Sequence, residues 1–269
     1  MPHYSIRHLL VSLVLLSFVV ASYFSIEYIT SPTVTMMVTE SGWMIYDQTA
    51  CDGCSVQAGD IVLSIEGLTY EPDTFLAPFA GYESGDVLEL EVLRDGEIID
   101  AALRIPTPDI SDVFVKFLIF VFWAPFWLSA AWLAYYAPID TKTITMTAMF
   151  SVYAVWVVAG LVSSAFVPAA SVVVHVATWM LVPITVHTHW ISPSPLRWRI
   201  PRWVSIGLYT VFLLLSIAEL FRAIPRQLFT IGTVLMVVSP FLLLAFHRDK
   251  SHLNARRMMF MGIITLTVP

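Results

Sequence analysis

Two cysteines, Cys51 and Cys54, have the spacing that most directly suggests chemistry. The C-x-x-C spacing occurs in tight disulfides, in redox pairs and in half of a zinc site. Neither a second C-x-x-C motif nor a histidine pair lies close by in the sequence, which argues against structural zinc. The interpretations left open are a loop disulfide, a redox pair, and two small loop residues without chemistry.

A second set of reactive side chains lies inside long apolar runs. His187 and His189 are two residues apart, so a helix would point them to different faces, and with His175 they are expected to be interfacial rather than metal ligands. Glu219 lies one helical turn before Arg222, and this spacing predicts an ion pair on the helix surface.

Recognisable catalytic motifs are missing from the sequence. It contains no H-E-x-x-H, no G-x-S-x-G and no phosphate-binding glycine loop. The sequence therefore predicts no catalytic residue, no metal ligand and no cofactor in this chain, and it leaves open whether a longer protein is an enzyme.

The composition is that of a membrane protein with one water-soluble insert. Apolar residues make up 58% of the chain and charged residues 13%, whereas a soluble domain is nearer a quarter charged. Residues 31–112 hold sixteen of the twenty Asp and Glu but only two of the fourteen Lys and Arg. A basic membrane part and an acidic insert argue against nucleic acid as a partner.

The apolar residues form runs of about 20, long enough to cross a bilayer core of about 30 Å. Six full spans are predicted, at about Leu9–Ser25, Val113–Tyr136, Thr143–Phe166, Ala170–Trp190, Trp203–Phe221 and Leu228–Phe246. A seventh run begins near Met258 and reaches Pro269 after about a dozen residues, too few to span. The sequence is thus expected to be the N-terminal piece of a longer protein, with residues 1–30 as a retained anchor and 113–269 as the bundle.

Basic residues in the short loops predict the orientation. They gather on one side of the predicted spans, the side of Arg7: Lys142, Arg197, Arg199, Arg202, Arg248, Lys250, Arg256 and Arg257. The positive-inside rule makes that side cytoplasmic. The expected location is the plasma membrane, with a cytoplasmic N-terminus and residues 31–112 extracytoplasmic.

The acidic insert has a pattern of strands and turns. Gly59-Asp60 leads into a short apolar strand at Ile61–Ile65, and Glu66-Gly67 closes it. In Val87–Val92 apolar residues alternate with Glu89 and Glu91, as in a half-buried strand. Asp95-Gly96 is a strong two-residue hairpin signal, and a return strand is expected through Ile98–Ile105.

These motifs resemble those of the bacterial PDZ domain. The resemblance covers about residues 35–105 and rests on S-V-Q-A-G-D-I-V-L-S-I-E-G followed by G-D-V-L-E-L-E-V-L-R-D-G-E. The fold class expected is therefore an α-helical polytopic membrane protein with an inserted small α+β, mostly β, PDZ-like extracytoplasmic domain. A short helix is expected from Asp73 to about Ala80.

The PDZ resemblance implies binding of a peptide or protein segment by strand addition, with the ligand terminus held by a backbone loop. By position, the binding loop and strand would comprise Ser41, Gly42, Trp43, Met44 and Ile45, and a helix wall would carry Phe75, Leu76 and Phe79. Gly42-Trp43 departs from the family's carboxylate loop, so capture of a terminal carboxylate does not follow. The apolar members of this set can equally be core residues.

The order of one span, an extracytoplasmic PDZ-like domain and further short-looped spans resembles the sensor half of competence-pheromone-receptor histidine kinases. This resemblance implies a membrane receptor that couples a peptide-like signal to a cytoplasmic output domain, with a homodimer left open. The alternatives are a non-catalytic PDZ scaffold or transporter subunit, and a PDZ-containing intramembrane protease. The sequence names neither the ligand nor the output domain.

Overall fold

The computed structural model describes residues 3–30, 36–38, 43–45, 55–69, 82–83, 85–105, 110–163, 167, 169–192, 196, 201–221 and 223–246. The chain divides into two compact units. The helical unit comprises Met1–Ala21, Trp123–Val157 and Val172–Pro269. The sheet unit comprises Ser22–Phe122 and Val158–Ser171.

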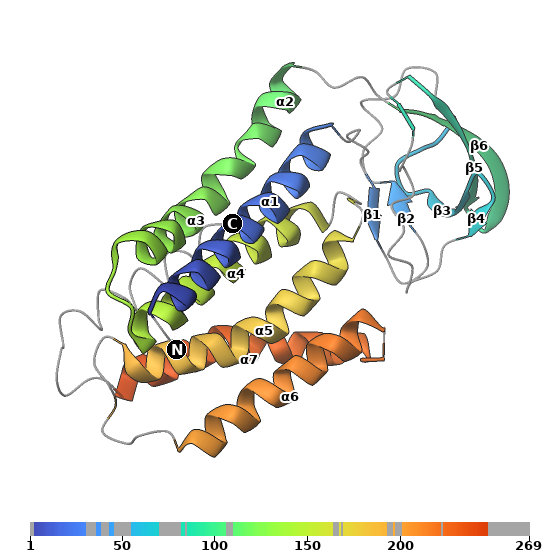
Figure 1. The fold of residues 1–269 in the computed structure, drawn as a ribbon. Coiled ribbons are helices and arrows are strands. Elements are labelled where there is room, and N and C mark those ends of the chain that lie inside the picture. Colours follow the sequence, from blue (N-terminus) through green and yellow to red (C-terminus); the bar gives the residue numbers. More distant parts are fainter. Residues whose placement is uncertain are drawn as a thin grey trace. The chain divides into compact units, whose positions relative to one another are not determined.

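The described helices are long and apolar, as the sequence predicts. They are α1 (His3–Thr30), α2 (Ile110–Phe117), α3 (Ile119–Tyr136), α4 (Thr141–Ser163), α5 (Ala170–Ile191), α6 (Arg202–Leu220) and α7 (Arg226–Phe246) (Figure 1). Helices α2 and α3 continue one another, so six segments have the length and composition to cross a membrane. The six predicted spans are thus confirmed as helices of spanning length, which suggests a multi-pass membrane protein. The segment from Met258 lies outside the described residues.

Helix α4 begins at a capping aspartate. The backbone N–H of Thr143 donates to Asp140 Oδ1 at 2.7 Å, and the N–H of Ile144 donates to the carbonyl of Asp140 at 3.0 Å. The first of these bonds satisfies an amide that the helix cannot pair, and it also lowers the pKa of Asp140 because it favours the charged carboxylate.

The described strands form one antiparallel sheet. It contains β1 (Met36–Val38), β2 (Trp43–Ile45), β3 (Ile61–Ile65), β4 (Leu68–Thr69), β5 (Val87–Arg94) and β6 (Glu97–Arg104). Their order is β1-β2-β3-β5-β6, with β4 paired to β3. In Figure 1, β5 and β6 are the long curved arrows. The predicted strand at Ile61–Ile65 and the two-stranded hairpin that follows are confirmed, while the helix expected at Asp73–Ala80 lies outside the described residues.

The hairpin turn follows the predicted chemistry. Asp95 and Gly96 have φ angles of 53° and 89°. Positive φ at both central residues is the requirement of a type I′ turn, which Asp-Gly meets at little steric cost. The β5–β6 ladder then runs without a register shift from Arg94↔Glu97 to Val87↔Arg104.

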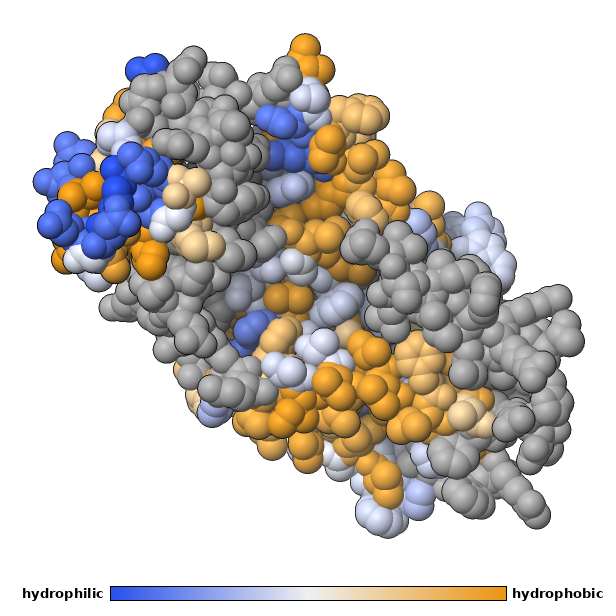
Figure 2. Space-filling model, turned by 180° about the vertical axis from the view of Figure 1, so that it is seen from behind, coloured by the Kyte–Doolittle hydropathy of each residue, from blue (hydrophilic) through white to orange (hydrophobic). Residues whose placement is uncertain are grey.

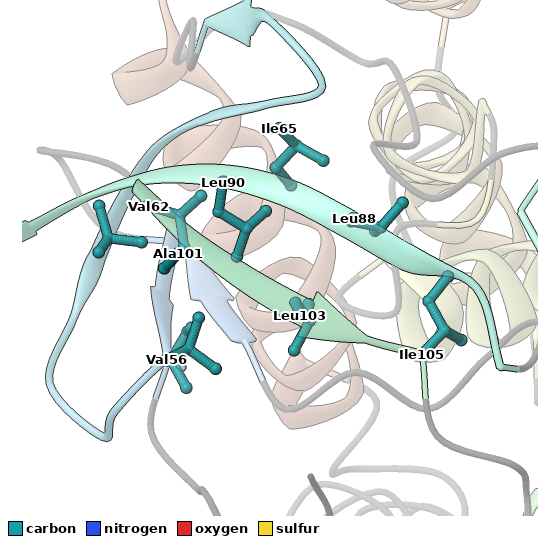
Figure 3. Packing of buried hydrophobic residues seen from close by; sticks show 10 residues of the cluster. Val56, Val62, Ile65, Leu88, Leu90, Ala101, Leu103 and Ile105 are labelled. Carbon is teal, nitrogen blue, oxygen red and sulfur yellow. The ribbon is translucent and has the colours of Figure 1, made fainter. Parts of the chain in front are cut away.

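The sheet buries one face. Leu88, Leu90 and Val92 of β5 are 0–2% exposed, whereas Glu89 and Glu91 between them are exposed. Leu103 of β6 packs in the same core, opposite Leu88 across the hairpin (Figure 3). The remaining core side chains are Ile45, Val56, Val62, Ile65, Ala101 and Ile105. The period-two burial confirms the half-buried strand that the sequence predicts.

One strand departs from simple alternation. The β3–β5 register shifts between Val62, which pairs with Val92, and Ser64, which pairs with Glu91. This is a β-bulge, in which one extra residue, Leu63, occupies β3. Because of it, Ser64 faces Glu91 on the outer side and donates a 2.8 Å hydrogen bond to Glu91 Oε2.

The helical unit has two apolar clusters. In one, Leu10 and Val14 of α1 pack against Ala130 and Ala134 of α3, where small side chains allow a close approach. In the other, Trp179 and Leu181 of α5 are buried with side chains of α6 and α7. Figure 2 shows that hydrophobic residues dominate the visible surface of the helices, whereas hydrophilic residues dominate the visible surface of the sheet unit.

Candidate functional site

The edge strand β1 is one place where this chain can pair with a strand from a binding partner. Backbone N–H and C=O groups of Ile45 bond to Asp60 and Gly59, on the β3 side of β2. Because adjacent residues of a strand point their backbone groups to opposite sides, Met44 bonds to its partner on β1, which is Met37. Met36 and Val38 consequently direct their backbone groups away from β2. Within the described residues, no strand pairs with that side of β1.

This pairing corrects the expectation that a ligand strand adds beside Trp43–Ile45. Strand β2 pairs with β1 on one side and with β3 on the other, so it has no unpaired side over these three residues. The edge lies one strand earlier in the chain. Of the other predicted binding residues, Ser41, Gly42, Phe75, Leu76 and Phe79 lie outside the described residues, as do Cys51 and Cys54. Their proposed roles stay predictions.

The opposite edge of the sheet is covered at its middle. Ser55 donates its backbone N–H to the carbonyl of Ala102 at 3.1 Å, and its Oγ accepts the N–H of Ala102 at 2.7 Å. Both backbone groups that Ala102 directs outward are therefore satisfied within the chain. Strand β6 is a poorer template for a partner than β1 for this reason.

The segment that covers β6 is held by an ion pair between a buried aspartate and a partly exposed arginine. Arg94 contacts both carboxylate oxygens of Asp60, with Nε–Oδ1 at 2.8 Å and Nη2–Oδ2 at 2.6 Å, and it donates to the Ser55 carbonyl at 2.9 Å. Asp60 Oδ2 also accepts the N–H of Gln57 at 2.7 Å. The hydrogen bonds from Arg94 lower the pKa of Asp60, against the opposing effect of burial, and the same pair raises the pKa of Arg94.

The outer face of the sheet carries an acidic hollow of about 830 Å³. Its acidic lining residues are Glu66, Glu89, Glu91 and Asp100. Two of these carboxylates have local partners, since Glu66 Oε1 accepts the N–H of Glu89 at 2.9 Å and Glu91 accepts from Ser64. A concave surface with this charge favours cationic groups over anionic ones.

The helical unit contains a polar cluster that sequence reasoning did not assemble. His175 Nδ1 of α5 lies 2.6 Å from Glu219 Oε1 of α6, with side-chain exposures of 15% and 8%. Trp179 Nε1 lies 3.4 Å from Glu219 Oε2. His175 is therefore bonded to a buried carboxylate, and its expected interfacial position stays a prediction. The predicted pair of Glu219 with Arg222 stays a prediction, because Arg222 lies outside the described residues.

The other two histidines of α5 have separate partners. His187 Nδ1 lies 3.1 Å from the hydroxyl of Tyr209 on α6, and His189 Nδ1 lies 2.8 Å from the carbonyl of Thr185 in its own helix. Each of the three histidines thus contacts a different group. The sequence contains only a weak signal for the His175–Glu219 contact: consecutive antiparallel helices bring the start of one beside the end of the next, but this does not identify His175 as the partner of Glu219.

Comparison with known proteins identifies no relative. No family model, no curated protein and no solved structure matches the chain.

Proposed function

We propose that this protein is a membrane receptor module whose sheet unit binds an extended peptide or peptide-like signal. The observation that carries the proposal is the edge strand β1, whose outward backbone groups at Met36 and Val38 have no partner strand among the described residues. An extended peptide can complete such an edge with main-chain hydrogen bonds. The motif order that resembles a PDZ domain supports the same mode of binding.

The charge of the sheet unit narrows the proposed ligand. The acidic hollow on its outer face and the sixteen acidic residues of 31–112 favour a peptide with basic side chains. The proposed orientation, with the basic loops in the cytoplasm, places this surface outside the cell. The ligand class proposed is thus a basic extracytoplasmic peptide.

Coupling through the helices is the second part of the proposal. A ligand can shift the equilibrium between two arrangements of the helix bundle only by the difference between its affinities for them. The proposed output is a cytoplasmic signalling domain, by the resemblance to sensor kinases. The reading frame after residue 269 tests this directly: a full-length protein without any signalling domain would refute the output part and leave the peptide-binding part standing.

Peptide binding is tested on the full chain in lipid nanodiscs. A library of ten-residue peptides, half of them rich in Lys and Arg, is screened first. The best binder is then measured against Val38→Pro, which removes one outward N–H of β1 but no β1–β2 bond. The matched control is Ile98→Pro, which removes an outward N–H at the opposite edge, on β6.

The expected result is a large loss of affinity in Val38→Pro and unchanged affinity in Ile98→Pro. Hydrogen exchange of the β5 amides verifies that both variants remain folded. Glu89→Lys, at an exposed position of the acidic hollow, is expected to weaken basic peptides selectively. Equal affinity in the wild type and Val38→Pro would refute strand addition at β1, and no binder in the library would count against a peptide ligand.

A further inference from the structure

The contact between His175 and Glu219 requires a proton. An imidazole nitrogen and a carboxylate oxygen 2.6 Å apart would repel each other if both were bare acceptors. One proton therefore lies between Nδ1 and Oε1. The indole N–H of Trp179 can only donate, so Oε2, 3.4 Å away, is the acceptor of that contact.

Three helices build the surroundings of this pair. On α5, Trp179 is 3% exposed and lies one turn after His175. On α7, the ring of Phe229 stacks on the His175 imidazole, with centroids 3.9 Å apart and planes at 23°. One turn further along α7, Gly232 lies directly against the Trp179 ring, where a Cβ would be 3.0 Å from it. The pair is thus enclosed by aromatic rings and closely packed backbone.

The charged groups that can reach the pair come from few positions. Helix α6 contributes Glu219 itself, with Ser216 one turn before it bonded to the carbonyl of Phe212. The described side chains that α7 contributes to these contacts are apolar. The sequence also places Arg222 three residues after Glu219 and Arg226 three residues before Phe229, and the side chains of both lie outside the described residues.

The position of the pair along the helices makes it accessible to protons from one side. His175 is near the start of α5, Glu219 is near the end of α6, and Phe229 is near the start of α7. All three lie within about two helical turns of the same end of their spans, or about 11 Å at 5.4 Å per turn. Ionisable groups inside a span are costly and mark proton and ion sites more often than structural ones.

We propose that His175 and Glu219 form a proton-binding site in the helical unit, where binding of a second proton releases the contact between α5 and α6. A neutral imidazole carries one N–H, which can occupy Nδ1 and supply the contact to the Glu219 carboxylate. The first added proton makes the pair an imidazolium and a carboxylate, with no net charge. The second added proton forms an O–H bond on Glu219 and leaves both imidazolium N–H groups in place. The attraction between opposite charges is then lost, and a net positive charge remains among aromatic rings.

The experiment follows the helices and the carboxyl group separately, using the full chain in lipid nanodiscs. Hydrogen exchange of the α6 amides is measured from pH 4 to pH 9, with rates corrected for the intrinsic effect of pH. Infrared spectra over the same range record the C=O stretch of protonated carboxyl groups. The variants are Glu219→Gln, which imitates the protonated carboxyl, and His175→Asn. His187→Asn is the matched control, since it removes a histidine of the same helix whose partner is a neutral hydroxyl.

In the wild type, exchange in α6 is expected to rise at least tenfold on acidification, together with a new carboxylic-acid band. Glu219→Gln should lack that band and exchange rapidly at every pH, and His175→Asn should move the transition along the pH axis. His187→Asn should behave as the wild type. A wild type whose α6 exchange is independent of pH, or a pH dependence that Glu219→Gln retains in full, would overturn the proposal.

Arg222→Gln separates the two candidate partners of Glu219. If His175 is the partner, Arg222→Gln retains the transition. If Arg222→Gln abolishes the transition while His175→Asn leaves it unchanged, the proton site does not include His175 and the proposal fails.

Discussion

The sheet and the helices distribute their side chains in opposite ways. In the sheet, Leu90 is 2% exposed while the neighbouring Glu89 is exposed. In α6, Leu214 is 60% exposed while Ser216 is 3% exposed. Hydroxyl side chains also fill much of the interior along α4 and α5, including Thr143, Thr145, Thr147, Ser151, Thr178, Thr185, Thr188 and Ser192.

The difference fits water around the sheet and an apolar solvent around the helices. In water, apolar side chains leave the surface and polar ones stay on it, which is the pattern of the sheet. In hydrocarbon there is no penalty for an exposed leucine, and polar groups turn inward to find partners, as Trp156 does when its Nε1 donates to Thr178 Oγ1 at 2.8 Å. One chain thus contains both patterns.

The largest effect is expected from truncating a core leucine of the sheet. Leu90→Ala should reduce the free energy of unfolding of the sheet by about 4 kcal/mol, because it removes buried apolar contacts and leaves a cavity. Leu214→Ala on α6 should change the stability of its helix by less than about 0.5 kcal/mol. Hydrogen exchange in the full chain measures both. Similar losses at the two positions would mean that α6 does not face an apolar solvent.

The ion pair of the sheet should come next. Arg94→Met should destabilise the sheet by less than Leu90→Ala does, since it leaves the Asp60 carboxylate, which is 2% exposed, without its charged partner. Chemical denaturation of the full chain, monitored by exchange of the β5 amides, gives the value. Asp60→Asn combined with Arg94→Met should recover part of the loss, and a double variant less stable than Arg94→Met would argue against the pair.

The same pair predicts a pH dependence with a definite sign. The hydrogen bond from Arg94 holds the pKa of Asp60 below its ordinary value of 3.8. A carboxyl group whose pKa is lower in the folded state than in the unfolded state stabilises the fold. This stabilisation is complete at pH values above the unfolded-state pKa, and it is lost as the pH falls through the folded-state pKa. The sheet should therefore lose stability below about pH 4. Asp60→Asn should flatten this part of the profile, and an unchanged profile would contradict the assignment.

Replacing either of two glycines in the helical unit with alanine should change its stability, but in opposite directions. Gly232→Ala should destabilise the unit by about 2 kcal/mol, because its Cβ would meet the buried Trp179 ring at 3.0 Å. Gly207→Ala, where nothing lies within 4 Å of the added Cβ, should stabilise α6 by about 0.5 kcal/mol through helix propensity. Thermal unfolding in nanodiscs measures both, and a stabilising Gly232→Ala would show that the Trp179 ring can move.

A smaller effect than that of Gly232→Ala is expected at the start of α4. Asp140→Ala should cost about 1 kcal/mol, because the Thr143 N–H loses its capping acceptor. Asp140→Asn retains an acceptor and should cost less. Exchange of the first-turn amides of α4 distinguishes the two, and equal values for both variants would indicate that the charge matters more than the hydrogen bond.

Local features of the fold follow from the sequence, and long-range ones do not. The Asp95-Gly96 turn and the alternation of Leu88 and Leu90 with Glu89 depend only on residues that are adjacent in the sequence, and so do the apolar runs of the helices. The pairing of β1 with β2 on one side, which moves the available edge away from Trp43, depends on where the chain returns in space. Short strands of three residues offer too little periodicity to predict that order.

The candidate sites show the same limit. Glu219 was expected to pair with Arg222 because the two are close in sequence, whereas the described contact joins Glu219 to a histidine 44 positions earlier. Only the antiparallel return of α6 along α5 brings these groups together. Likewise, nothing local in the sequence links Arg94 to Asp60, which lies 34 positions before it.

The bulge at Leu63 determines how this domain can tolerate changes in length. Every residue of β3 before the bulge belongs to one alternating pattern, and every residue after it belongs to the shifted pattern. Deleting Leu63 would remove the bulge and join Val62 directly to Ser64, so that Ser64 would stay opposite Glu91 and Ile65 would stay opposite Leu90 in the core. The bulge is therefore the place in β3 where the chain can lose a residue and keep every other side chain on its own face.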